Sequence, residues 1–230
     1  MGPSRLFLVL TQILGYSFQE PSFWHMTTAT SSLLSLGKSG PFRAADLEAV
    51  GVQRAYLARW LAQGVVERIS RGLYRLVEVE PTELGSVAEV ARRVPKGVIC
   101  LLTALQLHDL TSEVPHAVWL MIATKGHRPK IDFVKTELVH ASGLAFTSGV
   151  DVRMIEGVRV RVTSPAKTVA DCFRYRSRVG MEVAYTALRD YLEATRQRRS
   201  PEYTIPRLIA AAKVDRVDVL MRPSLEALVV

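Results

Sequence analysis

Residues 39–76 read SGPFRAADLEAVGVQRAYLARWLAQGVVERISRGLYRL, and this stretch decides the fold of the N-terminal part of the chain. Apolar residues recur at helical spacing over 44–50 and again over 53–63, with Gly51 between the two segments. Because an α-helix repeats every 3.6 residues, Leu57, Trp60 and Leu61 share one face and Arg59 lies on another. The pattern predicts two short helices joined by a tight turn.

A basic strand–turn–strand follows the second of these helices. Gly64 suits the left-handed position at a helix end. Val65, Val66 and Ile69 then lead to the turn Ser70-Arg71-Gly72, and residues 73–77 return as a second strand. We also expect a helix over 28–36, stopped by Gly37 and Gly40-Pro41. This order predicts a winged helix-turn-helix, whose second helix fits the major groove of DNA.

Composition and charge distribution are those of a folded protein with two basic regions. The chain has 230 residues, of which 48% are hydrophobic and 23% charged, and this composition excludes disorder and a fibre. The net charge is +8. Residues 38–76 carry seven basic and three acidic side chains, and residues 174–199 carry the same numbers, whereas residues 77–146 have a net charge of −1. The two basic regions would attract polyanions.

The first residues are apolar without being a membrane span. Residues 6–14 form an apolar run that is too short to cross a bilayer. A signal peptide is the alternative, but the run follows only Arg5 and no A-x-A cleavage site comes after it. We treat residues 1–26 as a leader, expect Met26 to begin the working protein, and expect a cytoplasmic protein with no membrane partner.

Residues 81–230 alternate between helical and extended patterns. Strands are expected over 117–124, 138–140, 150–155 and 158–162, with a hairpin turn at Glu156-Gly157. Helices are expected over 83–94, 98–107, 180–199, 205–212 and 217–228, and Ser164-Pro165 should cap and begin another. For 98–107 the alternative is a very short strand followed by the helix. The predicted fold class is α/β (mixed α+β), with a DNA-binding domain at 27–80, a linker at 79–82 and a second domain at 81–230.

Candidate DNA contacts lie on the second helix and on the wing. Polar side chains at the first turns of a recognition helix reach base edges, and arginines near its ends meet phosphate. The candidates on the helix are Gln53, Arg54, Tyr56 and Arg59, although Tyr56 borders the core, and those on the wing are Arg68, Arg71 and Arg75. The alternative for either group is a solvated surface. A candidate second basic patch comprises Arg174, Arg176 and Arg178, with an acidic-partner surface or a solvated turn as its alternatives.

Patterns that would indicate an enzyme are weak. Ser164-Pro165-Ala166-Lys167 fits the S-x-x-K motif of serine β-lactamases, but the partner motifs S-D-N and K-T-G are missing. Asp171 is expected to form an ion pair or a cap. Cys100 and Cys172 are far apart in apolar surroundings and predict buried free thiols. We expect no catalytic residue, metal or cofactor; nucleotide or phosphodiester chemistry in the second domain is the enzymatic alternative.

The chain resembles the AbiEi family of type IV toxin–antitoxin antitoxins over about residues 27–200. The matching positions are Asp46-Leu47, Gly51, Leu57, Gly64, Arg68, residues 71–75 (RGLYR) and residues 163–172 (TSPAKTVADC). The sequence departs from the family where Arg43 and Gln53 replace the Ser or Thr caps of the two helices, so helix capping should be weaker and the base contacts should differ.

The resemblance implies a transcriptional regulator with an antitoxin domain. It implies repression of the protein's own operon through double-stranded DNA, for which we expect inverted repeats in the promoter and an oligomer on the DNA. It also implies neutralisation of a nucleotidyltransferase-like toxin without a tight complex. The alternative is a ligand-responsive transcriptional regulator with no toxin partner.

Overall fold

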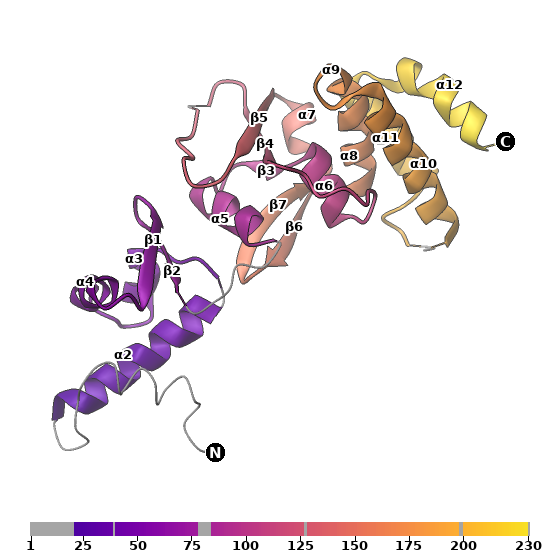
Figure 1. The fold of residues 1–230 in the computed structure, drawn as a ribbon. Coiled ribbons are helices and arrows are strands. Elements are labelled where there is room, and N and C mark those ends of the chain that lie inside the picture. Colours follow the sequence, from indigo (N-terminus) through magenta and orange to yellow (C-terminus); the bar gives the residue numbers. More distant parts are fainter. Residues whose placement is uncertain (1–20, 39, 78–83, 127, 198–199, 230) are drawn as a thin grey trace. The chain divides into compact units, whose positions relative to one another are not determined.

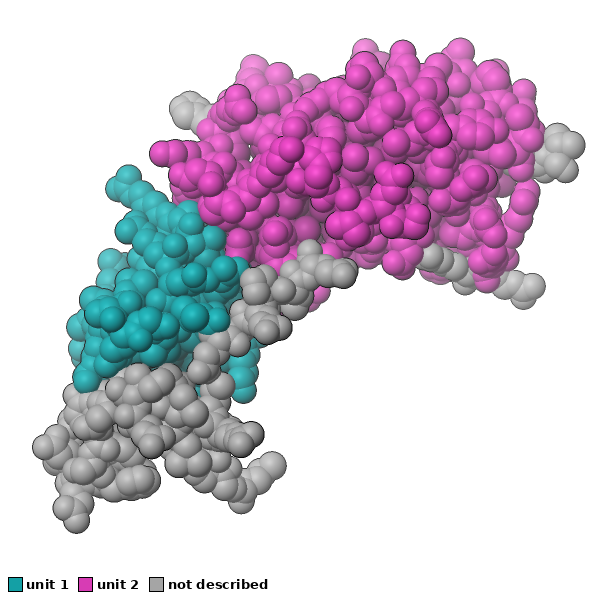
Figure 2. All heavy atoms as spheres, in the orientation of Figure 1, with its two compact units in different colours: residues 1–80 teal, residues 81–230 magenta. Residues whose placement is uncertain are grey.

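The computed structural model describes residues 21–38, 40–77, 84–126, 128–197 and 200–229 (Figure 1). The chain divides into two compact units, residues 1–80 and residues 81–230, which Figure 2 shows in two colours. Helices and sheets occur together along the chain, and the expected mixed α+β class is confirmed. The linker predicted at 79–82 lies outside the described residues, as do residues 1–20 of the leader.

The first unit is a small helical core closed by a hairpin. Its elements are α2 (Pro21–Lys38), α3 (Ala44–Ala49), α4 (Arg54–Ala62), β1 (Val66–Ser70) and β2 (Leu73–Leu76). β1 and β2 pair antiparallel. Phe42, which precedes α3, bridges to Tyr74 of β2 through two backbone hydrogen bonds of 2.9 Å. Leu33, Leu47 and Trp60 come together in the core beneath them. The order of helices followed by a hairpin is the one expected from the sequence.

The first helix differs from the prediction at both ends. α2 begins at Pro21, ahead of the expected start near Thr28, so no helix boundary falls at Met26. It also runs through Gly37, which was expected to stop it. A Cβ added to Gly37 would lie 2.3 Å from the Cδ1 atom of Leu76. The Leu76 side chain therefore leaves no room for a Cβ at position 37, which explains a glycine inside the helix.

The second unit is built on a mixed five-stranded sheet in the order β5-β4-β3-β7-β6. Its strands are β3 (Val98–Ile99), β4 (Val118–Ala123), β5 (Thr136–Ala141), β6 (Val150–Ile155) and β7 (Val158–Thr163). β4 pairs parallel with β5 and antiparallel with β3, and β7 pairs parallel with β3 and antiparallel with β6. The predicted strand run at 117–124 forms β4, whose side chains are almost all buried.

Helices cover both faces of this sheet, and strand residues alternate between them. Leu120 of β4 and Val160 of β7 face a cluster built with α5 (Gly85–Arg93). Trp119 and Met121 face a larger cluster on the other side. The helices of that larger cluster are α6 (Leu101–Leu107), α7 (Leu144–Thr147), α8 (Pro165–Arg174), α10 (Met181–Gln197), α11 (Ile205–Asp215) and α12 (Asp218–Val229).

Most helices and strands of the second unit lie where the sequence patterns predict them, and two regions need comment. The apolar run 98–107 takes the alternative form, a very short strand followed by a helix: it divides into β3 and α6 at Cys100, because Ile99 pairs in the sheet with Val162. A short helix α9 (Arg176–Val179), not expected from the sequence, lies between α8 and α10. The hairpin turn at Glu156-Gly157 is confirmed: both residues have positive φ, 46° and 67°, as a type I′ turn requires.

Candidate nucleic-acid interface

The turn between α3 and α4 positions the N-terminus of α4. Gly51 has a φ of +80°, and its N–H donates to the carbonyl of Glu48 at 3.0 Å. The N–H of Val52 donates to the carbonyl of Leu47 at 2.9 Å, and both side chains are buried. The left-handed residue reverses the chain without strain, and the buried pair holds α4 against α3. Neither Arg43 nor Gln53 caps its helix through its side chain. At the start of α3, however, the Asp46 carboxylate accepts a hydrogen bond of 2.7 Å from the backbone N–H of Arg43, so the expected weak capping holds only for α4.

The exposed residues at the first turns of α4 have either polar or small side chains. Gln53 and Arg54 are exposed, and so are Ala55 and Ala58. Arg54 forms an exposed ion pair of 2.6 Å with Glu48 of α3. Such a pair contributes at most about 1 kcal/mol, so the guanidinium can exchange it for another anion.

Tyr56 and Arg59 are less accessible than their neighbours. The Tyr56 ring lies 5.7 Å from the ring of the buried Trp60 and is itself half-buried. Arg59 is half-buried as well and has interactions within the protein. The sequence grouped both with Gln53 and Arg54; the structure gives Tyr56 a packing role and leaves Arg59 at the edge of the exposed surface.

The wing carries three arginines with different surroundings. Arg71 is exposed at the tip, beside Gly72, which has a φ of +77° and open space where a Cβ would lie. Arg68 is exposed, and its Nε donates to the carbonyl of Ser70 at 3.3 Å. Arg75 is held by Glu67 of the opposite strand at 2.6 Å, which offsets its charge. Arg68 and Arg71 are therefore the freer cations of this hairpin.

The arginines of the second basic patch are engaged within the second unit. Arg174 lies 3.6 Å from the buried Asp215. Arg178 pairs with Glu137 at 2.8 Å and stacks over the Trp119 ring at 5.1 Å. Arg176 is exposed and donates to the carbonyl of Phe173. Two of the three guanidiniums thus hold elements of the fold together, which favours a structural role over DNA contact.

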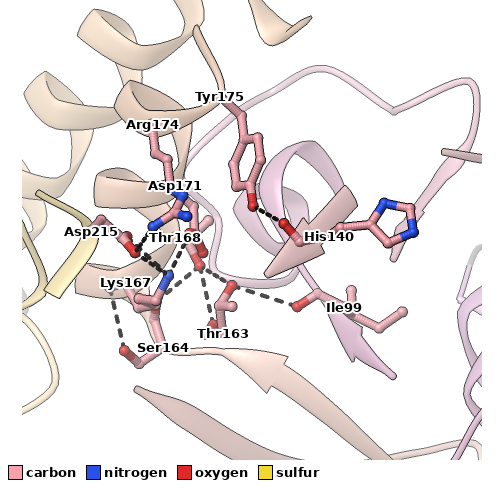
Figure 3. Close-up of polar contacts among 10 residues, drawn as sticks. All are labelled: Ile99, His140, Thr163, Ser164, Lys167, Thr168, Asp171, Arg174, Tyr175 and Asp215. Carbon is pink, nitrogen blue, oxygen red and sulfur yellow. Dashed lines mark hydrogen bonds and ion pairs between the residues drawn. The ribbon is translucent and has the colours of Figure 1, made fainter. Parts of the chain in front are cut away.

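The Ser164–Lys167 motif forms a helix cap and an ion-pair cluster. Ser164 accepts a hydrogen bond from the backbone N–H of Lys167, so it is the N-cap of α8, and Pro165 is the first helical residue. The Lys167 ammonium contacts Asp171 and both carboxylate oxygens of Asp215, the latter at 2.9 Å each (Figure 3). The ion pair expected of Asp171 is confirmed.

Burial and charge set the protonation of this cluster. Burial lowers the pKa of Lys167, but the two carboxylates outweigh it, and the net shift is upward. Burial raises the pKa of Asp171 to about 8, although Lys167 opposes that shift. A lysine held as an ammonium cannot take a proton from a serine, so the geometry does not support the S-x-x-K chemistry. The i,i+4 spacing of Lys167 and Asp171 was visible in the sequence; Asp215 comes from α11 and gave no signal.

Two further properties concern metals and membranes. Across the described ranges, no three His, Cys, Asp or Glu side chains are grouped so that they could hold a metal ion. Cys100 and Cys172 are buried free thiols. No helix in the described part of the chain has the length and apolar character needed to cross a membrane.

Comparisons with known proteins bear on the first unit and on the fold. Residues 32–77 match the family model described as "Transcriptional regulator, AbiEi antitoxin". A search of curated proteins found no match. The fold is similar to that in the crystal structure of RV2827C protein from Mycobacterium tuberculosis, with a TM-score of 0.50 over 86% of this chain and 81% of that chain. The two sequences are 12% identical, so this likeness concerns the fold alone.

Proposed function

We propose, from the premise that residues 32–77 are a regulator module of the AbiEi antitoxin family, that this protein binds DNA and represses its own operon. One observation carries the proposal: the exposed N-terminal turn of α4 and the exposed wing arginines belong to the matched module. The protein would act in the cytoplasm, on inverted repeats in its own promoter.

In this proposal α4 enters the major groove with its first turn toward the bases. Gln53 suits adenine and Arg54 suits guanine, because each side chain forms paired hydrogen bonds with that base edge. Ala55 and Ala58 have small side chains, which lets the helix backbone approach closely and can contact thymine methyl groups. Arg54 would exchange Glu48 for the nucleic acid. Tyr56 and Arg59 would support the helix position more than they read bases.

The wing would contact the backbone of the duplex. Arg71 and Arg68 project from the hairpin, and the glycine beside Arg71 allows the chain to come close to a phosphate or into the minor groove. Arg75 contributes less because Glu67 already pairs with it. Phosphate contacts fix the position of the module without reading sequence.

Binding is tested by fluorescence anisotropy on the protein's own promoter DNA over a range of salt concentrations. Arg54→Ala with Arg71→Ala should weaken binding and reduce the slope of log K against log salt by about 0.9 for each phosphate that the variant no longer neutralises. Arg189→Ala is the matched control, since Arg189 is an exposed arginine of α10 outside the module. An unchanged slope in the double variant would contradict the proposed interface.

Base reading is separated from phosphate contact by comparing single variants on mutated operators. Gln53→Ala should cost about 1–3 kcal/mol at one base position and relax the preference there. Arg71→Ala should weaken binding to all sequences alike. If Gln53→Ala leaves the sequence preference intact, α4 does not read bases through this residue.

We further propose that the second unit neutralises a nucleotidyltransferase-like toxin without a tight complex. The resemblance of residues 163–172 to the family motif supports this assignment. Expression beside the neighbouring gene tests it: wild type and the Arg54→Ala/Arg71→Ala variant should both restore growth, while only wild type represses the promoter. Failure of wild type to protect cells from a toxic neighbouring product would refute the antitoxin role.

A ligand-responsive regulator is the second candidate, supported by a cavity in the second unit. The cavity has a volume of about 280 Å³, and its lining includes the apolar Leu105 and Val183 and the acidic Glu113 and Glu182. A small apolar molecule carrying a cation would fit this lining. A DNA affinity that changes with such a ligand, in an operon without a toxin, would favour this candidate.

A further inference from the structure

The two edge strands of the second unit differ in how their outer backbone is occupied. On β5, the Arg178 guanidinium donates to the carbonyl of Leu138 at 2.5 Å. The Tyr175 hydroxyl donates to the carbonyl of His140 at 2.8 Å, as Figure 3 shows. Arg178 also pairs with Glu137. These side chains occupy carbonyls that an added strand would need, so the β5 edge is protected.

The outer backbone of β6 is open by comparison. β6 lies at the end of the strand order, and within the described ranges no strand pairs with its outer side. The two-residue turn makes Ile155 and Val158 a hydrogen-bonded pair. Hydrogen-bonded and non-hydrogen-bonded pairs alternate from there, so Val150, Val152 and Met154 direct their N–H and C=O groups away from β7.

The same strand exposes apolar side chains. Val152 is 53% exposed and Met154 is 64% exposed, and both lie on one face of the strand. Asp151 and Arg153 lie on the other face, where Arg153 donates to the carbonyl of Leu107 at 2.7 Å. Prolines and bulges protect an edge, and β6 has neither, because it pairs regularly with β7 over all six residues. The edge is therefore suited to accept a strand.

We propose that β6 pairs antiparallel with β6 of a second copy of this chain, about a two-fold axis at Val152. Residues opposite each other in an antiparallel pair share a face. In this register Val152 faces its own copy and Val150 faces Met154 of the partner, while Asp151 faces Arg153 of the partner twice. The register joins the two sheets, places opposite charges together and places apolar residues together.

Neighbouring registers lack this complementarity. An axis at Asp151 or at Arg153 would put two like charges opposite each other, which destabilises the pair. With an axis between Val152 and Arg153, the apolar side chains of one strand would lie on the same side of the joined sheet as the charged side chains of the other. Only the Val152 register also uses the outward N–H and C=O groups of residues 150, 152 and 154.

The interface is small, so the dimer is expected to be weak and dependent on concentration. A six-residue strand pair buries less than the roughly 1,200 Å² of a standard stable interface. Two-fold symmetry matches the symmetry of an inverted repeat, and simultaneous contact with two half-sites would raise the effective affinity. The dimer itself does not require DNA, and its test is made without it.

Sedimentation velocity of the full chain tests the proposal over concentrations from about 5 to about 500 µM, a range suited to weak interfaces. Wild type should shift from monomer toward dimer across the range. Val152→Lys should remain monomeric because two ammonium groups would meet at the axis. Val219→Lys is the matched control on α12, where Val219 is 73% exposed, and it should dimerise as wild type does.

Charge complementation tests the register. Asp151→Arg alone and Arg153→Asp alone should each be monomeric, because each brings like charges together twice. An equimolar mixture of the two should recover a heterodimer, since every cross-strand pair is then opposite in charge. Circular dichroism checks that each variant is folded. A wild type that stays monomeric, a Val152→Lys variant that dimerises like Val219→Lys, or a mixture of folded variants without heterodimer would overturn the proposal.

Discussion

Lys167→Met should destabilise the second unit strongly, because it removes the only cation in direct contact with Asp171 among the described residues. The side chains of Lys167, Asp171 and Asp215 are 2%, 0% and 0% exposed. Removing one partner of a buried ion pair costs about 3–5 kcal/mol, since the remaining charges stay desolvated. Arg174 lies 3.6 Å from Asp215 and would still neutralise part of its charge. We therefore expect a loss of stability near the lower bound of that range.

The pH dependence sharpens this prediction. The pKa of Asp171 is about 8 in the folded chain against an ordinary value of 3.8, so the folded state binds a proton that the unfolded state releases. This contribution to stability is present at low pH and is lost as the pH rises toward 8. Without the ammonium, which opposes the upward shift, the pKa of Asp171 would be higher still. Lys167→Met should therefore cost less stability at pH 5 than at pH 8.

Urea unfolding read by hydrogen exchange of peptides from α8 and α11 measures these effects in the second unit. Arg189→Met is the control, because the Arg189 side chain is 58% exposed and its pair with Asp190 should contribute less than about 1 kcal/mol. A Lys167→Met variant that loses no more stability than Arg189→Met at pH 8 would refute the assignment of a buried ionic cluster.

Two local substitutions test individual capping and turn residues. Ser164→Ala should cost about 1 kcal/mol in thermal or urea unfolding, because it removes the hydrogen bond to the backbone N–H of Lys167; an unchanged stability would show that Ser164 does not cap α8. Gly51→Ala should cost about 1 kcal/mol through its φ of +80° alone, since a Cβ there would meet open space. A cost well above that value would instead indicate that the α3–α4 turn rearranges.

The first unit could be read from sequence because its signals are local. Gly51 and Gly64 have the positive φ angles that a turn and a helix end require. Leu57 and Trp60 are buried where the helical spacing placed them. The role of Gly37 could not be read in this way: its neighbour Leu76 is distant in sequence, and a glycine near a helix end looks like a stop signal until that neighbour is known.

Several features of the second unit could not be read in advance for the same reason. β3 is too short for a periodic signal, and its place at the centre of the sheet depends on pairing with β4 and β7. The basic pattern of Arg174 and Arg178 suggested a nucleic-acid surface, but Asp215 and Glu137 lie beside them only after folding. The sequence gives the number of charged side chains in a segment. Ion pairs that form only in the folded protein determine which of those side chains can still bind an anion.

The amino-acid sequence alone determined the helix–turn–helix–hairpin order, the alternating strands and the Ser164 cap, since each depends on residues close along the chain. Tertiary structure alone decided the strand order, the cluster of Lys167 with Asp171 and Asp215, and the contrast between the protected β5 edge and the open β6 edge. These depend on contacts between residues far apart in sequence, whose energies no local pattern contains.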